Sequence, residues 1–333
     1  MCIRDRTNYL GLELKNPIIA GASDLTANME SIKQIEQAGA AALVIKSLFE
    51  EQIQLEAYRF EQQMAVYDEI HAEMISIFPR LEHAGSKEHL NWVKKAKDAV
   101  NIPVIASLNA VNPETWIEYA IQLAETGVDA LELNFYATPT NMKKSAAEIE
   151  QEHVDILKLI KNSVKIPVSV KLSPFYTNPL NFIEQLDTIG VDGFVLFNQF
   201  FQPDIDVSKE ENIFPFNWST QKEHRLPLRF VGLLFDKIRG DICASTGIFS
   251  GYDVVKMLLA GANTVQVVSA LFQKNVSIIS TMLEEMEKWM ESKGYSSLED
   301  FRGKMSESHN TDPWVYKRAQ YVKLLLQGNP VSM

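Results

Sequence analysis

Short, continuously apolar segments recur along this chain, and longer amphipathic segments with helical spacing separate them. Continuous apolar character is typical of parallel strands that are buried on both faces, whereas a half-exposed strand would alternate with polar residues. The sequence therefore predicts eight buried parallel strands, at residues 18–22, 42–47, 103–109, 130–136, 167–173, 193–198, 241–246 and 264–269.

Four of the intervening segments, 28–38, 113–125, 179–189 and 252–260, have helical spacing and are each followed within two residues by a glycine. After Gly127 and Gly190 the chain reads Val-Asp, and after Gly261 it reads Ala-Asn, before the next strand begins. A helix that ends at glycine and turns within two residues into a buried strand is the connection of a repeated β/α unit.

Eight such units predict an α/β fold, a closed (β/α)8 TIM barrel, entered through an N-terminal hairpin around Gly11. A doubly wound nucleotide-binding sheet would show a G-x-G-x-x-G turn after its first strand, but residues 20–24 read Ala-Gly-Ala-Ser-Asp. We predict one domain over residues 7–333. Residues 1–6 (MCIRDR) do not match the pattern and are set aside as a non-native or disordered leader.

Two insertions follow predicted strands 2 and 6, at residues 49–88 and 200–226. Both begin at the carboxyl ends of strands, which is where barrels place their active sites. Loops of this kind cover a site or form an oligomer contact, and the sequence does not separate the two roles.

The composition narrows the function further. The chain of 333 residues has a net charge of −11, two cysteines and no apolar run near the ~18 residues that a membrane span needs. These features indicate a soluble cytoplasmic protein that binds a small molecule and neither nucleic acid nor membrane. The cysteines and six histidines show no metal-ligand spacing, so we expect no metal site and an organic redox cofactor if there is one.

Lys46 and Lys171 each follow a buried strand, where a charge is costly without an anionic partner. Two lysines at one barrel mouth indicate function. Each could act as a Schiff-base nucleophile, a phosphate counter-ion or a stabiliser of an anionic cofactor. The turns at 245–248 and 268–270 lead into helices, so their backbone N–H groups could converge on one phosphate.

Several motifs over residues 7–305 resemble the dihydroorotate dehydrogenase family of flavin-dependent barrels, closest to its soluble members. They are Asn16-Pro17 with Gly21-Ala-Ser23, Ile45-Lys-Ser47, Glu132-Leu-Asn134, Val170-Lys-Leu-Ser-Pro174, Thr246-Gly-Ile248, Val268-Ser-Ala-Leu271 and the tail from Lys293 to Lys304.

The resemblance implies bound FMN and hydride transfer between flavin N5 and a C–C bond next to a carbonyl. It implies that Asn134 and Asn198 contact substrate and that Lys46 and Lys171 serve catalysis as well as the flavin. The cofactor-binding positions that it implies are Ala22, Ser23, Lys46, Ser47, Asn134, Lys171, Phe197, Thr246, Gly247, Val268 and Ser269. A lysine near flavin N1 would stabilise the negative charge of the reduced ring.

Two departures from the family pattern concern the substrate side. The family loop Asn-x-x-Cys/Ser-Pro, whose Cys or Ser removes a proton, reads here Asn134-Phe-Tyr-Ala-Thr-Pro139 and is one residue longer. This leaves Thr138 as the candidate proton carrier, with Ala137 at the strict spacing. The family segment Asn-x-x-Gly-Leu-Pro-Asn, which holds orotate, has no counterpart in 49–88.

Three hypotheses follow. The first is an FMN-dependent oxidoreductase acting on dihydroorotate or a related pyrimidine or small acid, with a soluble electron acceptor or a partner subunit. The second is a Schiff-base lyase or aldolase that uses Lys171 or Lys46. The third is a flavin-binding homologue with lost or altered activity. Analogy with soluble family members adds the expectation of a homodimer.

Overall fold

The structure is a computed structural model, and it describes residues 6–50, 84–135, 141–199, 202–215, 217–312, 315–317, 322 and 326. Most of the predicted insertion at 49–88, all of 136–140 and the leader residues 1–5 lie outside these ranges. The prediction of one domain over 7–333 stays a prediction, because much of 313–333 lies outside them too.

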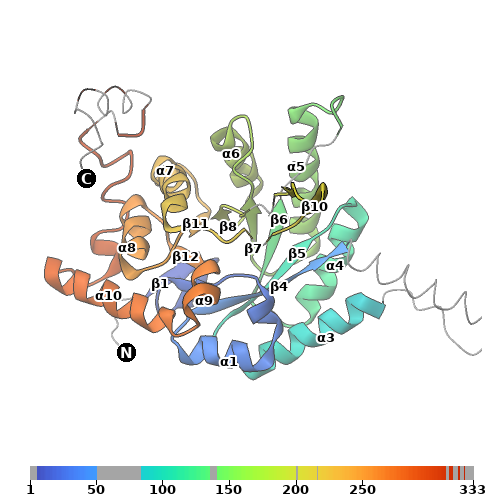
Figure 1. The fold of residues 1–333 in the computed structure, drawn as a ribbon, viewed down its shortest axis with the longest axis horizontal. Coiled ribbons are helices and arrows are strands. Elements are labelled where there is room, and N and C mark those ends of the chain that lie inside the picture. The colour runs from blue at the N-terminus through green and yellow to red at the C-terminus, as the bar shows by residue number, and fades with distance from the viewer. Residues whose placement is uncertain are drawn as a thin grey trace, which may run out of the picture.

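Eight parallel strands close into a barrel around a buried core, which confirms the predicted (β/α)8 fold (Figure 1). Each strand pairs with the next in sequence, and closure comes from pairing of the last strand with the first. The barrel strands are β3 (Ile18–Ala20), β4 (Ala42–Phe49), β5 (Val104–Asn109), β6 (Ala130–Phe135), β7 (Val168–Leu172), β8 (Gly193–Leu196), β11 (Asp241–Ser245) and β12 (Thr264–Val267).

Helices surround the barrel, and the sequence located four of them to within one residue at each end. The predicted helices 113–125 and 179–189 are α4 and α6 with unchanged bounds. The helices described are α1 (Met29–Gln37), α3 (Ala84–Ala99), α4 (Pro113–Glu125), α5 (Ala146–Ser163), α6 (Pro179–Ile189), α7 (Arg225–Leu234), α8 (Gly251–Ala260), α9 (Ser269–Lys274) and α10 (Ile278–Lys293), with short 3-10 turns η2 (Asp24–Ala27), η3 (Gln221–His224) and η4 (Leu298–Asp300).

The repeated Gly-x-Asp/Asn turns have a structural cause. The Asp129 carboxylate accepts a hydrogen bond from Val104 N at 2.7 Å, and Asp192 accepts from Val168 N at 2.8 Å. The third copy uses an amide, since Asn263 Oδ1 accepts from the N–H of Ile242 at 2.9 Å. Each turn thus satisfies a backbone donor at the start of the neighbouring strand, which would otherwise be buried without a partner.

The predicted N-terminal hairpin, β1 (Thr7–Tyr9) and β2 (Leu12–Leu14), packs against the amino ends of the barrel strands. Tyr9 and Leu10 are almost fully buried, and Leu10 N donates to Asp241 Oδ2 at 2.7 Å. The hairpin therefore closes one end of the barrel and leaves the carboxyl ends of the strands as the open end.

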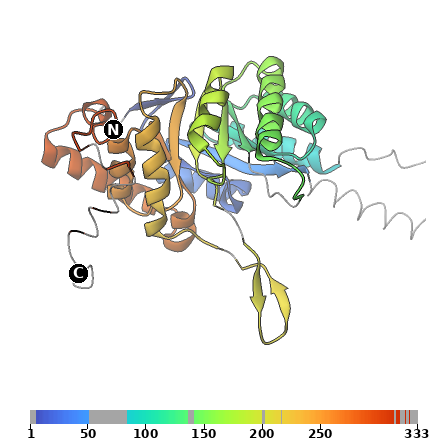
Figure 2. The same cartoon turned by 90° about the horizontal axis from the view of Figure 1, so that it is seen from above.

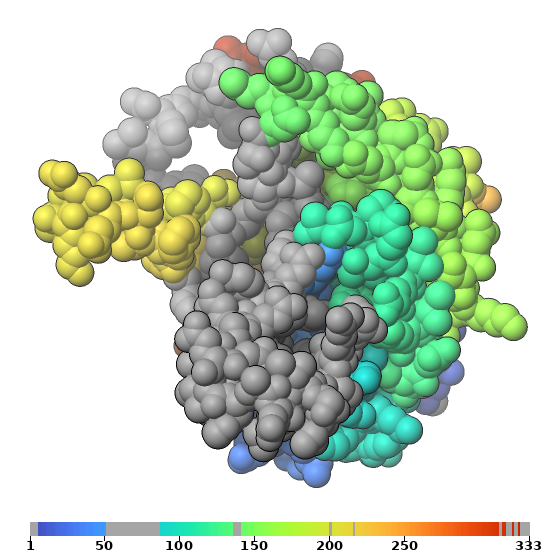
Figure 3. Space-filling model, turned by 90° about the vertical axis from the view of Figure 1, so that its right-hand side faces the viewer, coloured from blue at the N-terminus to red at the C-terminus, as the bar shows by residue number. Residues whose placement is uncertain are grey.

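The insertion after β8 contains a two-stranded hairpin, β9 (Asp204–Asp206) and β10 (Glu211–Ile213), that stands out from the barrel (Figures 2 and 3). Its strands are exposed along nearly their whole length. Among the described helices, none is both long and apolar enough to cross a bilayer.

His153 on α5 gives the fold a pH-dependent contribution to stability. Its ring stacks on Phe135 with centroids 4.7 Å apart, and burial lowers its pKa from the ordinary 6.5 to about 4. The folded protein thus binds this proton less readily than the unfolded chain. The contribution is present above about pH 6.5 and decreases as the pH falls towards 4.

We expect the unfolding free energy to lose about 2 kcal/mol from this residue between pH 8 and pH 5. His153→Phe keeps an aromatic ring but cannot titrate. In urea denaturation, the variant should therefore lose about 2 kcal/mol less unfolding free energy between pH 8 and pH 5 than wild type does. Because His89 also has a lowered pKa and remains in both proteins, it cancels in the comparison. An equal loss in wild type and variant would contradict the assignment.

Candidate functional site

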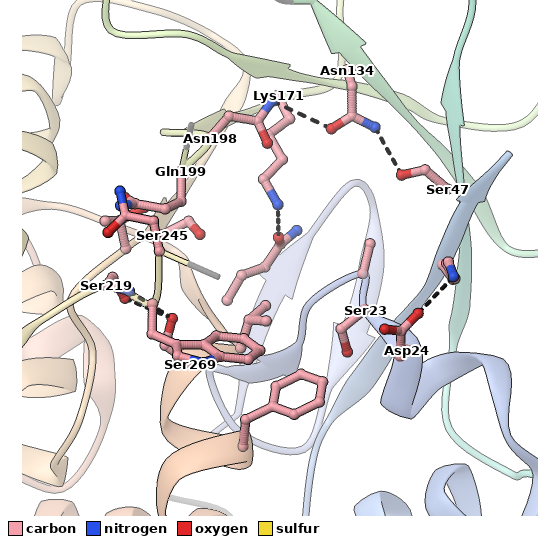
Figure 4. A pocket seen from close by; sticks show the side chains of 18 of the residues that line it. Ser23, Asp24, Ser47, Asn134, Lys171, Asn198, Gln199, Ser219, Ser245 and Ser269 are labelled. Atoms are coloured by element: carbon pink, nitrogen blue, oxygen red, sulfur yellow. Dashed lines mark hydrogen bonds and ion pairs between the residues drawn. The ribbon is translucent and has the colours of Figure 1, made fainter. Parts of the chain in front are cut away.

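A cavity of about 450 Å³ opens at the carboxyl ends of the barrel strands (Figure 4). This volume lies within the range of roughly 300–1,000 Å³ that cofactor and substrate pockets occupy. The cavity brings together nearly all the described positions that the sequence assigned to cofactor or substrate, namely Ala22, Ser23, Lys46, Ser47, Asn134, Lys171, Asn198, Thr246, Gly247, Val268 and Ser269.

A buried ionic cluster lies at the floor of this cavity, with Lys171 and Gln266 lining it and Glu132 directly beneath. Lys171 Nζ donates to Gln266 Oε1 at 3.0 Å and lies 3.7 Å from Glu132 Oε1. Gln266 Nε2 in turn donates to Glu132 Oε2. The side chains come from β7, β12 and β6, and each is less than 10% exposed. A buried ammonium ion needs such partners, and those found here account for one of the three donors of Lys171.

Asn134, at the end of β6, is the centre of a second polar group. Its amide Nδ2 lies 2.8 Å from Ser107 Oγ and 3.2 Å from Ser47 Oγ, and its Oδ1 accepts from Asn198 Nδ2 at 3.4 Å. Figure 4 shows this side chain between Asn198 and Ser47, above the cavity. The contacts fix the amide and hold four strand ends in a common arrangement.

Lys46 lies at a break in the barrel register. Between Ile45 and Leu48 the pairing of β4 with β5 shifts, and Lys46 and Ser47 occupy this irregularity. Such a bulge redirects side chains, and here it turns Lys46 towards Asp24, with Nζ and Oδ1 2.6 Å apart. The Lys46 charge together with burial lowers the pKa of nearby His89 to about 4, burial being the larger cause.

The two turns expected to bind phosphate lie side by side. Ser219, from the insertion after β8, joins them: its Oγ accepts from Gly247 N at 3.4 Å and donates to Ser269 Oγ at 2.9 Å. Thr246 and Gly247 both adopt left-handed backbone conformations, and Thr246 Oγ1 donates to Phe197 O at 3.0 Å. Ser219 therefore brings together one polar group from each turn, Gly247 N and Ser269 Oγ, at the wall of the cavity.

The structure differs from the expected cofactor contacts at the start of α8 and at Phe197. The N-terminus of α8 is not free for a phosphate, because Gly251 N donates to Glu285 Oε2 at 2.6 Å and Asp253 accepts from Phe249 N. Phe197 does not line the cavity; its ring packs edge-on against Phe230, and only its carbonyl contacts Thr246. Thr138 lies outside the described residues.

Sequence reasoning missed several polar residues of the site, among them Asp24, Ser107, Glu132, Ser219 and Gln266. A signal existed for two of them, because Glu132 and Gln266 each stand between two apolar residues of a buried strand, in Leu-Glu-Leu and Val-Gln-Val. A polar side chain inside a strand buried on both faces needs a buried partner. The partners of the other three lie on distant segments.

A substitution at Gly247 would test whether the turn after β11 tolerates a side chain. A Cβ at this position would lie 2.3 Å from His224 N, a backbone atom that cannot rotate away, and φ is +78°. Gly127 has a similar φ of +85° with nothing within 4 Å of the same point. We expect Gly127→Ala to cost about 1–2 kcal/mol of unfolding free energy, and Gly247→Ala about 3 kcal/mol or more because the contact is added. Equal losses in urea denaturation would show that the close approach is unimportant.

Comparison with known proteins places this site in a family. The model of the dihydroorotate dehydrogenase family matches residues 5–290. The catalytic subunit of dihydroorotate dehydrogenase B (NAD(+)) from Methanocaldococcus jannaschii is 27% identical over 290 residues, covering 84% of this chain and 92% of the relative. A dihydroorotate dehydrogenase A (fumarate) from Lactobacillus helveticus is 23% identical over 310 residues, covering 91% and 99%. Because the family model covers most of its length, the chain belongs to the dihydroorotate dehydrogenase family.

Proposed function

We propose that this protein is an FMN-dependent oxidoreductase that transfers hydride between flavin and a C–C bond adjacent to a carbonyl. The observation that carries the proposal is the buried Lys171 ammonium at the floor of the cavity, which has one hydrogen-bond acceptor at 3.0 Å among the described residues. A cation held in this way suits an aromatic ring that gains negative charge when it is reduced.

The residues present fit FMN in two further respects. Amide and hydroxyl groups of Asn134, Ser47 and Asn198 face one side of the cavity, where they can bond the polar edge of a flavin ring. On the other side, the Gly247 N–H and the Ser269 hydroxyl are donors for a phosphate. A phosphate there would replace some of the hydrogen bonds that Ser219 now makes.

When bound, FMN would supply the hydride acceptor or donor. The chain's own residues would do the rest: Lys171 and Asn134 would orient the ring, Asn198 would contact substrate, and Thr138 would move the substrate proton. Dihydroorotate or a related pyrimidine or small acid is the substrate class that we propose. A soluble acceptor or a partner subunit would take the electrons. The names of two relatives give NAD(+) and fumarate as examples of acceptors.

The lysines support this proposal over a Schiff-base lyase. A Schiff-base nucleophile must be a neutral amine, whereas Lys171 lies beside Glu132 and Lys46 forms a 2.6 Å ion pair with Asp24. Each lysine is therefore engaged with a carboxylate rather than placed to attack a carbonyl carbon.

The purified protein should be yellow, with flavin absorbance bands near ~370 and ~450 nm, and heat should release FMN, identified by its mass. Anaerobic addition of dihydroorotate or a dihydropyrimidine should then bleach the ~450 nm band. A colourless protein that takes up no added FMN would overturn the proposal, and borohydride trapping of a carbonyl substrate would then favour the lyase. A yellow protein that none of these reductants bleaches would favour the homologue with altered activity.

Thr138 has the most direct test of its proposed role. Thr138→Val keeps the size of the side chain and removes the hydroxyl group, so substrate-dependent flavin reduction should slow by about 10²–10⁴-fold, as general acid–base groups contribute. Thr138→Ser should retain most of the rate, and both variants should bind FMN as wild type does. If stopped-flow reduction of Thr138→Val stays within a few-fold of wild type, Thr138 is not the proton carrier.

A further inference from the structure

We infer that Glu132 and Gln266 are positioning residues that hold the Lys171 ammonium towards the cavity and set how much of its positive charge reaches a bound ring. The inference rests on the proposed FMN function. It concerns buried side chains at the floor of the cavity, where Lys171 and Gln266 line it and Glu132 lies beneath them. Glu132 does not line the cavity, so its action is through Lys171.

The three side chains come from opposite walls of the barrel. Glu132 and Lys171 lie on the neighbouring strands β6 and β7, whereas Gln266 reaches in from β12, four strands away from β6 in the barrel order. The order of contacts is Lys171 to Gln266 at 3.0 Å, and Gln266 to Glu132. Figure 4 shows Lys171 pointing down into the cavity to meet the amide oxygen.

Gln266 satisfies its two neighbours in only one orientation. Its oxygen must face the ammonium ion and its NH₂ group must face the carboxylate, because the opposite arrangement would set donor against donor and acceptor against acceptor. The amide therefore bridges the two charges. Lys171 Nζ stays 3.7 Å from Glu132 Oε1, which accepts no hydrogen bond among the described residues.

This arrangement has two electrostatic consequences. The bridge keeps the ammonium ion from closing onto Glu132, so two of its three donors remain for a group in the cavity. The nearby carboxylate also offsets part of the ammonium charge, and this offset is strong because both groups are buried. Changes at the two positions should therefore shift the reduction potential of a bound flavin in opposite directions.

Glu132→Gln removes the offsetting charge and keeps the shape. The reduced, more negative flavin should gain affinity relative to the oxidised form by about tenfold, which raises the midpoint potential by ~30 mV for a two-electron couple. Gln266→Met removes the bridge, so Lys171 should close onto Glu132. The potential should then fall by a similar amount, and FMN affinity should fall with it.

Ser169→Ala is the matched control. Ser169 precedes Lys171 by two positions on β7, is fully buried, and donates to Leu131 O at 3.1 Å. It is the register partner of Glu132 across β6 and β7, so Ser169→Ala alters packing next to Glu132 without removing a charge from the cluster. Potentials are measured by anaerobic redox titration of the FMN-bound proteins against reference dyes, and Kd for FMN by fluorescence quenching. The control should leave both quantities unchanged.

The outcomes separate this inference from the proposed function. Wild-type protein that binds no FMN refutes the function and the inference together. Wild type that binds FMN, with variant potentials equal to that of wild type or shifted in the same direction, refutes the inference alone. A general loss of packing would lower stability in both variants without opposite shifts. If Glu132→Gln does not fold, the downward shift in Gln266→Met still decides the matter.

Discussion

Closure of the barrel between β12 and β3 is the constraint on which the site depends. Pairing of Val265 with Ile18 and of Gln266 with Ile19 joins the last strand to the first. This fixes the register of every other strand, because each one pairs with its sequence neighbour. Gln266 therefore points across the barrel to side chains 95 and 134 positions earlier in the sequence.

Gly21 shows how closely the strands approach at this closure. A Cβ at Gly21 would lie 2.6 Å from Val268 Cγ2 and 3.2 Å from Gln266 Oε1. The first βα turn thus needs a residue without a side chain so that the last strand can pass beside it. The same turn leads directly into Ser23 and Asp24, so the glycine that permits closure also sets the position of one cavity wall.

Next to the cavity the barrel interior holds charged and amide side chains, whereas at its other end it is filled by apolar ones. Replacing buried ionic groups by apolar side chains of similar volume is often neutral or stabilising, whereas removing one partner leaves a costly unpaired charge. The Glu132, Lys171 and Gln266 cluster therefore contributes little to the stability of the fold for its size. Its placement beneath the cavity is better explained by the chemistry above it.

Local patterns were enough to predict the fold. Strand and helix bounds follow from runs of apolar residues and from glycines such as Gly190, whose left-handed conformation ends α6. The strand-end polar residues Asn134 and Lys171 were predicted for the same reason, since parallel strands bring their carboxyl ends to one face. The resemblance then supplied the roles that the residues alone left open.

The partners of those residues could not be predicted, because they depend on distant parts of the chain. Ser219 comes from an insertion without repeat pattern, yet it joins the turns at Gly247 and Ser269. The ion pair of Lys46 with Asp24 depends on a register shift in β4 that the apolar run 42–47 does not reveal. The bond that occupies Gly251 N at the start of α8 was equally out of reach, since Glu285 comes from the later helix α10.

Burial divides the site into two parts that tolerate change differently. At the floor, Lys171 and Glu132 are nearly inaccessible to water. A change of charge there therefore has a large free-energy cost, because no solvent screens it. At the lip, the side chains of Lys46 and Asp24 are 42% and 64% exposed, and an ion pair of this kind is worth at most about 1 kcal/mol. A new substrate can therefore be accommodated by changes at the lip while the floor is retained. The sequence agrees with this division. The motif Glu132-Leu-Asn134 at the floor resembles the family pattern, whereas the two departures from that pattern fall in loops that follow strands.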